Sequence, residues 1–175
     1  MKLLACCSAG SSADVGSCFE GRTYRYHYWR RINTGTGPTV TFVMLNPGDV
    51  YTNVDLKKNA TLTRCYGVAE ACGYSWLRVI NLTPLIEHSP DECLRHQPAP
   101  VVEDRNRMHI ELALAGADAV AAWGTWSGSY VDCVRKSFLD GRVDRLLCLG
   151  HTDSGAPRHP LYVPLATALV PFMRT

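Results

Sequence analysis

Two polar residues follow apolar or turn-forming sequences, where folded chains often present functional side chains. Asn46 comes directly after the apolar stretch 39–45, and His159 lies in a proline-rich turn late in the chain. An Asn side chain can orient a water molecule through its carbonyl oxygen but cannot accept a proton at neutral pH. A His on a loop can donate to an oxygen that gains negative charge. The pair predicts a site that positions water and stabilises a negative charge.

Alternating apolar runs and helical patterns predict the elements that position these residues. The predicted strands cover residues 39–45, 76–80, 119–123 and 146–149. Apolar residues three and four apart predict helices over 62–72, 103–115, 130–139 and 165–173. Apolar strands that alternate with helices are typical of a parallel sheet covered on both faces. We therefore expect a three-layer αβα fold around a central, mostly parallel four-stranded sheet.

We expect residues 1–175 to form one domain, with 1–23 as a poorly defined N-terminal segment. The sequence 24–29 alternates with period two and predicts an edge strand. In parallel sheets the ligand binds beyond the carboxyl ends of the strands. The polar and Gly/Pro clusters that follow the four predicted strands would all emerge along that edge, so the site is expected there.

Composition narrows the class of protein without naming a partner. The 175 residues are 46% hydrophobic and 19% charged, with a formal net charge of +2, which is ordinary for a globular protein. The eight cysteines form no CxxC pair, so we expect free thiols in the reducing cytoplasm. No apolar run approaches the roughly 18 residues of a membrane span. His88, Cys93 and His96 are too irregularly spaced for a zinc site, and we expect no metal or cofactor.

Four motifs in a fixed order resemble the domain-of-unknown-function family 1643, from about Arg25 to the C-terminus. They are Met44-Leu45-Asn46-Pro47-Gly48, Asn81-Leu82, Ala122-Trp123-Gly124 and Gly155-Ala156-Pro157-Arg158-His159-Pro160-Leu161-Tyr162. The same order is similar to the uracil-DNA-glycosylase superfamily, especially its mismatch-specific branch. There an Asn-Pro-Gly loop follows the first core strand, and a late motif carries His-Pro or Asn-Pro. This second resemblance implies a uracil-DNA-glycosylase-like form of the expected fold.

The resemblance implies a role for each matching residue. Asn46 would hold and polarise the hydrolytic water, and Pro47 and Gly48 would shape the loop over a flipped-out base. Asn81 would read the Watson–Crick edge of the base, although it could equally cap the loop before Pro84. His159 would stabilise negative charge on the departing base.

Three departures from the resembling families bear on the substrate. The uracil enzymes carry an activating Asp where this chain has Asn46, so Asp49 would have to supply any base catalysis. Family 1643 usually has an acidic residue where this chain has Asn59, a position that could contact phosphate or sugar. Gly48 stands where uracil-specific enzymes place a bulky ring that excludes C5 substituents. A larger base than uracil is therefore expected, such as a modified pyrimidine of phage DNA, which would make the protein a defence factor.

These inferences combine into one expected activity with two alternatives. We expect a monomeric, monofunctional DNA glycosylase that cleaves the N-glycosidic bond of a flipped-out base and leaves an abasic site. A non-catalytic DNA- or nucleotide-binding module and a hydrolase or transferase acting on free nucleosides or nucleotides remain open. The remaining site candidates are Trp123 and His151 in the base pocket, with Trp123 alternatively in the core, and Lys57, Lys58, Arg64 and Arg158 at the DNA backbone.

Overall fold

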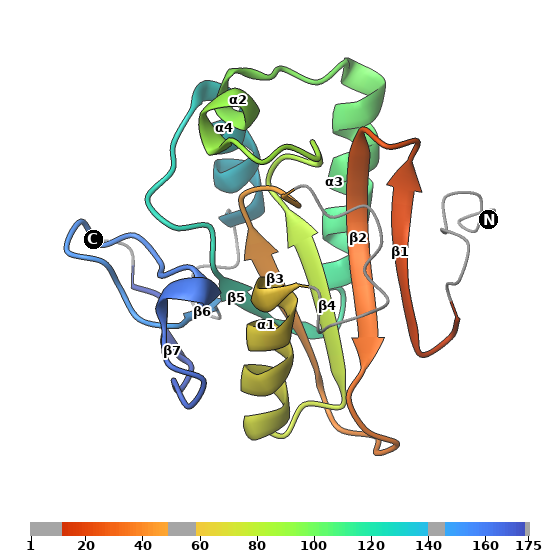
Figure 1. Ribbon diagram of the computed structural model, residues 1–175, viewed down its shortest axis with the longest axis vertical. Helices are drawn as coiled ribbons and strands as arrows, with labels where there is room; N and C mark the ends of the chain where they lie inside the picture. The colour runs from red at the N-terminus through yellow and green to blue at the C-terminus, as the bar shows by residue number, and fades with distance from the viewer. Residues whose placement is uncertain (1–11, 49–58, 140–145, 174–175) are drawn as a thin grey trace.

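Seven strands form one sheet at the centre of the molecule. The computed structural model describes residues 12–48, 59–139 and 146–173, and the strands lie in the order β1-β2-β4-β3-β5-β6-β7 (Figure 1). They are β1 (Val15–Glu20), β2 (Tyr24–Arg31), β3 (Thr39–Met44), β4 (Trp76–Asn81), β5 (Ala117–Ala121), β6 (Leu146–Cys148) and β7 (Val170–Pro171). The four strands predicted from apolar runs are confirmed as β3, β4, β5 and β6.

The sheet is mixed, and the expected fold class is wrong. β3 pairs in parallel with β4 and β5, and β5 pairs in parallel with β6. The pairs β1–β2, β2–β4 and β6–β7 are antiparallel. A mostly parallel four-stranded sheet of the uracil-DNA-glycosylase type is therefore contradicted. Apolar runs reveal only four strands because β1, β2 and β7 carry polar, aromatic or proline residues.

Both ends of the chain depart from the expected elements. The strand predicted over 24–29 is present within β2, but β1 pairs outside it, so β2 is not at the edge. β1 itself lies in the N-terminal segment for which the sequence predicts no element. The helix predicted over 165–173 is wrong, because part of this segment forms β7 beside β6. Pro171 lacks a backbone N–H and its ring opposes a continuing helix.

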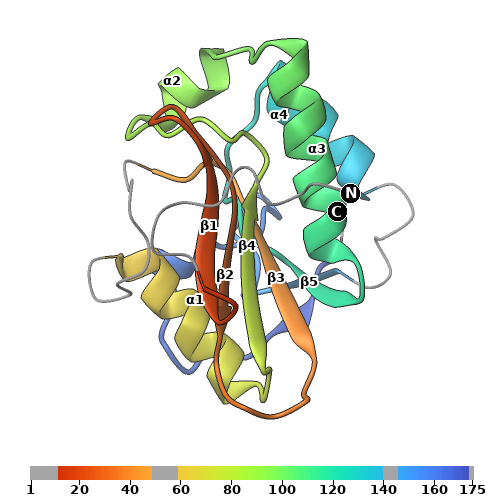
Figure 2. The same cartoon turned by 90° about the vertical axis from the view of Figure 1, so that its right-hand side faces the viewer.

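Helices cover both faces of the sheet. Helix α1 packs on one face, whereas α3 and α4 lie on the other (Figure 2). The helices are α1 (Ala60–Ala71), α2 (Pro90–Arg95), α3 (Pro100–Leu114) and α4 (Ser129–Leu139), with a short 3-10 turn, η4 (Pro160–Tyr162). The helices predicted over 62–72, 103–115 and 130–139 are confirmed as α1, α3 and α4. None of the helices in the described ranges is long and apolar enough to cross a membrane.

Residues next to each other in a strand pack in two separate hydrophobic cores, one on each face of the sheet. Phe42 and Val79 pack with residues of α1, while Val43 and Ile80 pack with residues of α3 and α4. Successive side chains of a strand point to opposite faces, so each strand contributes to both cores. The sheet is thereby held rigidly between two apolar layers.

This topology brings six chain segments to one edge of the sheet. The carboxyl ends of β3, β4 and β5 meet there because these strands are parallel. β2 runs antiparallel to β4, with His27 opposite Ile80, so the first residues of β2 reach the same edge. The start of α1 and the segment before η4 complete it.

A β-bulge interrupts β2 near this edge. Cys18 pairs with His27 and Phe19 pairs with Arg25, which leaves Tyr26 as an extra residue. A bulge re-aims the side chains beside it, because it breaks the alternation of faces along the strand. His27 packs near His109 of α3, with ring centroids 6.1 Å apart, whereas Arg25 lines a pocket that includes the start of α1.

Candidate functional site

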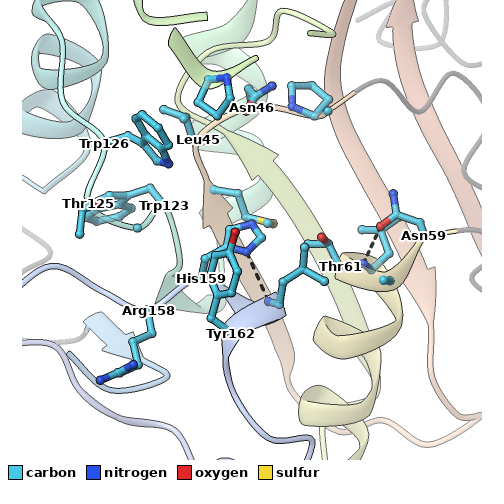
Figure 3. Close-up of a pocket in the computed structure, with 18 of the residues that line it drawn as sticks. Leu45, Asn46, Asn59, Thr61, Trp123, Thr125, Trp126, Arg158, His159 and Tyr162 are labelled. Atoms are coloured by element: carbon cyan, nitrogen blue, oxygen red, sulfur yellow. Dashed lines mark hydrogen bonds between the residues drawn. The ribbon is translucent and has the colours of Figure 1, made fainter. Parts of the chain in front are cut away.

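A pocket of about 760 Å³ opens at this edge. Its volume lies in the range of small-molecule sites, roughly 300–1,000 Å³. The lining includes residues 44–48 after β3, 59–62 at the start of α1, 123–126 after β5, and Arg25, Arg158 and His159. Figure 3 shows Asn46 and His159 on separate walls of this pocket.

His159 presents a neutral imidazole to the pocket. The backbone N–H of Leu161 donates to its Nδ1 at 3.3 Å. Burial lowers the pKa of His159 from 6.5 to about 4, so the ring is uncharged at neutral pH. Because Nδ1 accepts, the single proton of the neutral ring lies on Nε2. The pocket therefore holds an imidazole N–H donor whose orientation is fixed by the backbone of η4.

Asn46 is fixed through its amide nitrogen. Nδ2 donates to the backbone carbonyl oxygen of Glu87 at 2.6 Å, which links the turn after β3 to the chain after β4. No hydrogen bond to Oδ1 occurs within the described part of the chain, so this oxygen is the atom of Asn46 that is available to accept. A fixed carbonyl oxygen of this kind can hold a water molecule but cannot take its proton.

Gly48 leaves its side of the pocket open. Its backbone has φ of +67°, in the left-handed region that favours glycine. A Cβ placed there would meet no heavy atom within 4 Å among the described residues. Pro47 beside it also lines the pocket. Within the described ranges, the turn therefore leaves room for a substituent on a bound ring.

Aromatic side chains form further parts of the wall. Trp123 is 2% exposed and packs edge-on against Phe138 and Phe172, so this candidate belongs to both the core and the pocket. Trp126 is 38% exposed and Tyr162 is 78% exposed. The ring centroids of Tyr162 and His159 lie 5.7 Å apart. Flat, partly exposed rings of this kind can stack on a base.

Arg25 is the most unusual residue of the lining. Arg25 is 3% exposed, and its Nε and Nη1 atoms are buried without a hydrogen-bond partner among the described residues. Burial lowers the pKa of Arg25 to about 10, which still leaves the guanidinium charged at neutral pH. A buried charge without a partner is costly, so its retention needs a reason.

Two of the candidates for the base pocket lie outside the lining of this pocket. Asn81 is 1% exposed, and neither amide atom of its side chain has a hydrogen-bond partner in the described part of the chain. Asn106 of α3 donates to the backbone carbonyl oxygen of Asn81, on the far side of the sheet from α1. His151 stacks on Phe172, with ring centroids 5.5 Å apart. Neither side chain is brought to Asn46 or His159.

The candidates for DNA contacts fall into three groups. Arg158 lines the pocket, but its Nε donates to the carbonyl oxygen of His151 and the side chain extends away from His159 (Figure 3). Arg64 donates to the carbonyl oxygen of Val163, so it ties α1 to the segment after η4. Lys57 and Lys58 lie outside the described residues, as does Asp49, the candidate for base catalysis.

The structure adds residues that the sequence does not single out. Arg25, Thr61 and Tyr162 all line the pocket. A charged residue inside the aromatic sequence 24–29 is the one indication that could have identified Arg25. Within the described chain, no group of three or more His, Cys, Asp or Glu could hold a metal ion.

Comparison with known proteins gives one match. The profile of the family described as "Protein of unknown function (DUF1643)" matches residues 25–161, which cover most of the sheet and the pocket. No curated protein and no solved structure matches the chain significantly.

Proposed function

Since the chain belongs to the DUF1643 family of proteins of unknown function, its activity has to be inferred from the pocket. We propose that it is a DNA glycosylase that hydrolyses the N-glycosidic bond of a C5-substituted pyrimidine and leaves an abasic site. We also propose a remote relationship to the uracil-DNA-glycosylase superfamily, based on the motifs that contain Asn46 and His159. It rests on these motifs and the pocket, and it makes no use of the sheet topology.

The neutral His159 is the observation that carries this proposal. As the bond between C1′ of the sugar and N1 of the base breaks, its electron pair moves onto the base and positive charge develops on the sugar. The Nε2–H of His159 would donate to the base oxygen that gains charge. One preorganised donor of this kind contributes about 3–4 kcal/mol to transition-state stabilisation. A neutral donor also avoids a cation beside the developing positive sugar.

Asn46 would supply the second half of the reaction. Its Oδ1 would hold a water molecule that bonds to C1′ as the base leaves, and the water proton passes to solvent or to the departing base. Because Asn46 cannot accept this proton, the route must be dissociative, with the cationic sugar formed before the water loses its proton. The products are the free base and an abasic deoxyribose.

The turn at Gly48 supports a base larger than uracil. Since no described residue fills the space beside it, a C5 substituent could be accommodated there. We propose modified pyrimidines of phage DNA as the substrates, which would make the protein a defence factor in the cytoplasm. The six cysteines in the described ranges are free thiols, which suits that compartment.

A second function is favoured by the size of the pocket. About 760 Å³ is more than a base alone requires, and Arg25 offers a charge that a phosphate could neutralise. Hydrolysis or transfer on a free nucleotide is therefore the alternative activity.

One experiment separates these activities. Duplex and single-stranded DNAs carrying uracil, thymine or C5-modified cytosine, and the corresponding mononucleotides, are incubated with the protein. Abasic sites in the DNA are then cleaved with alkali, and base released from the mononucleotides is measured by chromatography. We expect breaks at C5-substituted bases that vanish in Asn46→Ala and persist in the control His96→Gln, which lies outside the pocket. Release of base only from mononucleotides would support the second function. Binding without any base release would overturn both and leave a non-catalytic module.

The base preference is tested at Gly48. Asn tolerates the left-handed backbone, so Gly48→Asn is expected to keep the turn while its side chain enters the open space. The variant should lose activity on C5-substituted bases by about tenfold relative to uracil. An unchanged preference would show that Gly48 does not set the size of the base.

A further inference from the structure

The described lining of the pocket carries positive charge and no carboxylate. Arg25 and Arg158 are both in it, and no Asp or Glu of the described residues joins them. Most buried cations in proteins are paired with a carboxylate. Here the pairing group for Arg25 is missing from the described chain, which makes the pocket electrostatically suited to an anion.

The start of helix α1 adds a second positive feature to the same pocket. Ala60 and Thr61 line it, and the first turn of the helix contains no acidic residue. The Asn59 side chain accepts from the N–H of Leu62, which fixes the start of the helix. Exposed N–H groups at the first turn of a helix carry partial positive charge and bind phosphates.

The bulge in β2 provides the reason why Arg25 reaches this place. In a regular strand without the bulge, alternation would put Arg25 on the same face as His27, against α3. The bulge instead places Arg25 in the pocket lining, together with the start of α1. Bulges are frequent next to functional sites, where they re-aim a side chain.

We propose that Arg25 and the first turn of α1 form a subsite that binds a phosphate group of the nucleotide. The proposal deepens the function proposed above, since it names the part of the substrate that enters beside the base. A guanidinium presents paired N–H donors that match two oxygens of one phosphate, which a single ammonium cannot do. The phosphate belongs either to a strand of DNA or to a free nucleotide; the chemistry is the same, and the experiment distinguishes the two sources.

If Arg25 serves to bind phosphate, replacing it should stabilise the unliganded protein, although most substitutions of buried residues destabilise a protein. Replacing a buried charge that lacks a partner by an apolar side chain of similar length removes its desolvation cost. Arg25→Met is therefore expected to raise the melting temperature of the unliganded protein. An arginine that served only the structure would give the opposite result.

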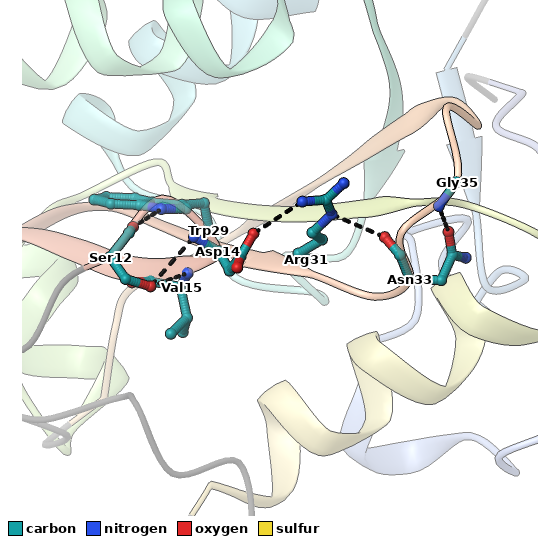
Figure 4. A network of polar contacts seen from close by, with 7 residues as sticks. All are labelled: Ser12, Asp14, Val15, Trp29, Arg31, Asn33 and Gly35. Carbon is teal, nitrogen blue, oxygen red and sulfur yellow. Dashed lines mark hydrogen bonds and ion pairs between the residues drawn. The ribbon is translucent and has the colours of Figure 1, made fainter.

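Arg31 on the same strand provides a matched control. Its Nη1 lies 3.2 Å from Oδ1 of Asp14, and its Nε donates to the carbonyl oxygen of Asn33 (Figure 4). Since Arg31 already has partners outside the pocket, Arg31→Met removes an arginine from β2 without touching the subsite. It should leave ligand binding unchanged and should not raise the melting temperature.

Binding is measured by calorimetry with thymidine, thymidine 5′-monophosphate and a thymine-containing trinucleotide. We expect the wild-type protein to bind at least one phosphate-bearing probe about tenfold or more tightly than thymidine. In Arg25→Met this preference should fall to near unity. Preference for the monophosphate alone would identify a free nucleotide as the source, and preference for the trinucleotide alone would identify DNA.

Equal binding of all three probes by the wild-type protein would overturn the proposal, as would an Arg25→Met variant that keeps the preference. If that variant fails to fold, Arg25 is structural and the proposal fails in its present form. Asn59→Asp provides an independent check, because it puts a carboxylate at the start of α1. It should weaken binding of phosphate probes several-fold without lowering the melting temperature.

The binding result can be separated from the proposed reaction. Phosphate-dependent binding without base release would leave the subsite in place and overturn the glycosylase activity. Base release with no preference for phosphate-bearing probes would support the glycosylase activity and overturn the phosphate subsite.

Discussion

The protonation state of His159 determines what this pocket can offer to a leaving group. Burial holds the pKa of His159 at about 4, and the N–H of Leu161 fixes which ring nitrogen carries the proton. The site thus has a neutral donor throughout the physiological range. An imidazolium would donate more strongly, but it would also repel a cationic sugar.

The pH profile of activity tests this state. Since the pKa of His159 is about 4, the contribution of its neutral ring to kcat/KM should be constant from pH 8 to about 5 and change only near pH 4. The measurement is kcat/KM as a function of pH over the range in which the protein stays folded. An acidic limb with an apparent pKa near 6.5 that disappears in His159→Gln would show that the ring titrates normally.

Replacing Asn46 by Asp tests why this chain lacks a carboxylate there. Nδ2 of Asn46 donates to the carbonyl oxygen of Glu87, and an Asp would put two acceptor oxygens 2.6 Å apart. We expect Asn46→Asp to lower the free energy of unfolding by about 1–3 kcal/mol and the activity at least tenfold. Urea denaturation and base release measure the two effects. A variant more active than the wild-type protein would show that the water needs a base.

At the scale of elements, helix α1 begins at a residue that also lines the pocket. The side chain of Asn59 accepts from the N–H of Leu62 at 2.9 Å. Asn59→Ala should therefore lower the free energy of unfolding by about 1 kcal/mol. Urea denaturation measures this change, with Thr63→Ala in the exposed first turn as the comparison. A loss no larger than that of Thr63→Ala would mean that the cap does not fix the start of α1.

The sequence predicts those strands and helices that can be recognised from the local pattern of apolar residues alone. Buried strands such as β3 and β5 are apolar runs, and α1, α3 and α4 show apolar residues at helical spacing. Such patterns are local, so they can be recognised without knowing what packs against them. The turn at Asn46 is found because it directly follows such a strand.

The elements that the sequence misses depend on distant partners. β2 reaches the pocket only through its antiparallel pairing with β4, some fifty residues later in the chain. The bulge that re-aims Arg25 arises from the register between β1 and β2. The segment 165–173 has a helix-like pattern, but pairing with β6 and Pro171 give a strand instead. Neither register nor pairing partner is present in a local pattern.

For the molecule as a whole, the two cores support one functional edge. Trp123 joins the core on the α3 and α4 side to the site, because it lines the pocket and packs edge-on against Phe138 and Phe172. Buried histidines lie elsewhere in the same framework. Burial lowers the pKa of His27 to about 3, with His109 nearby as a second cause, and burial also lowers the pKa of His109.

These histidines predict sensitivity to acid. Their folded-state pKa values lie below the unfolded value of 6.5, so the unfolded chain takes up protons first as the pH falls. The stabilisation that depends on neutral His27 is complete above about pH 6.5 and is lost progressively toward pH 3, by about 2 kcal/mol between pH 7 and pH 5. Urea denaturation at several pH values should give a shallower dependence for His27→Gln. Identical slopes would show that His27 does not titrate between the two states.

The most direct test of the central claim is the detection of the released base. DNA containing a C5-substituted pyrimidine is incubated with the wild-type protein, Asn46→Ala and His159→Gln, and the free base is quantified by mass spectrometry. The account predicts release by the wild-type protein, with a loss of about 100-fold or more in His159→Gln, equivalent to the roughly 3–4 kcal/mol of one donor. Release at the wild-type rate by both variants, or no release from any DNA by the wild-type protein, would contradict it.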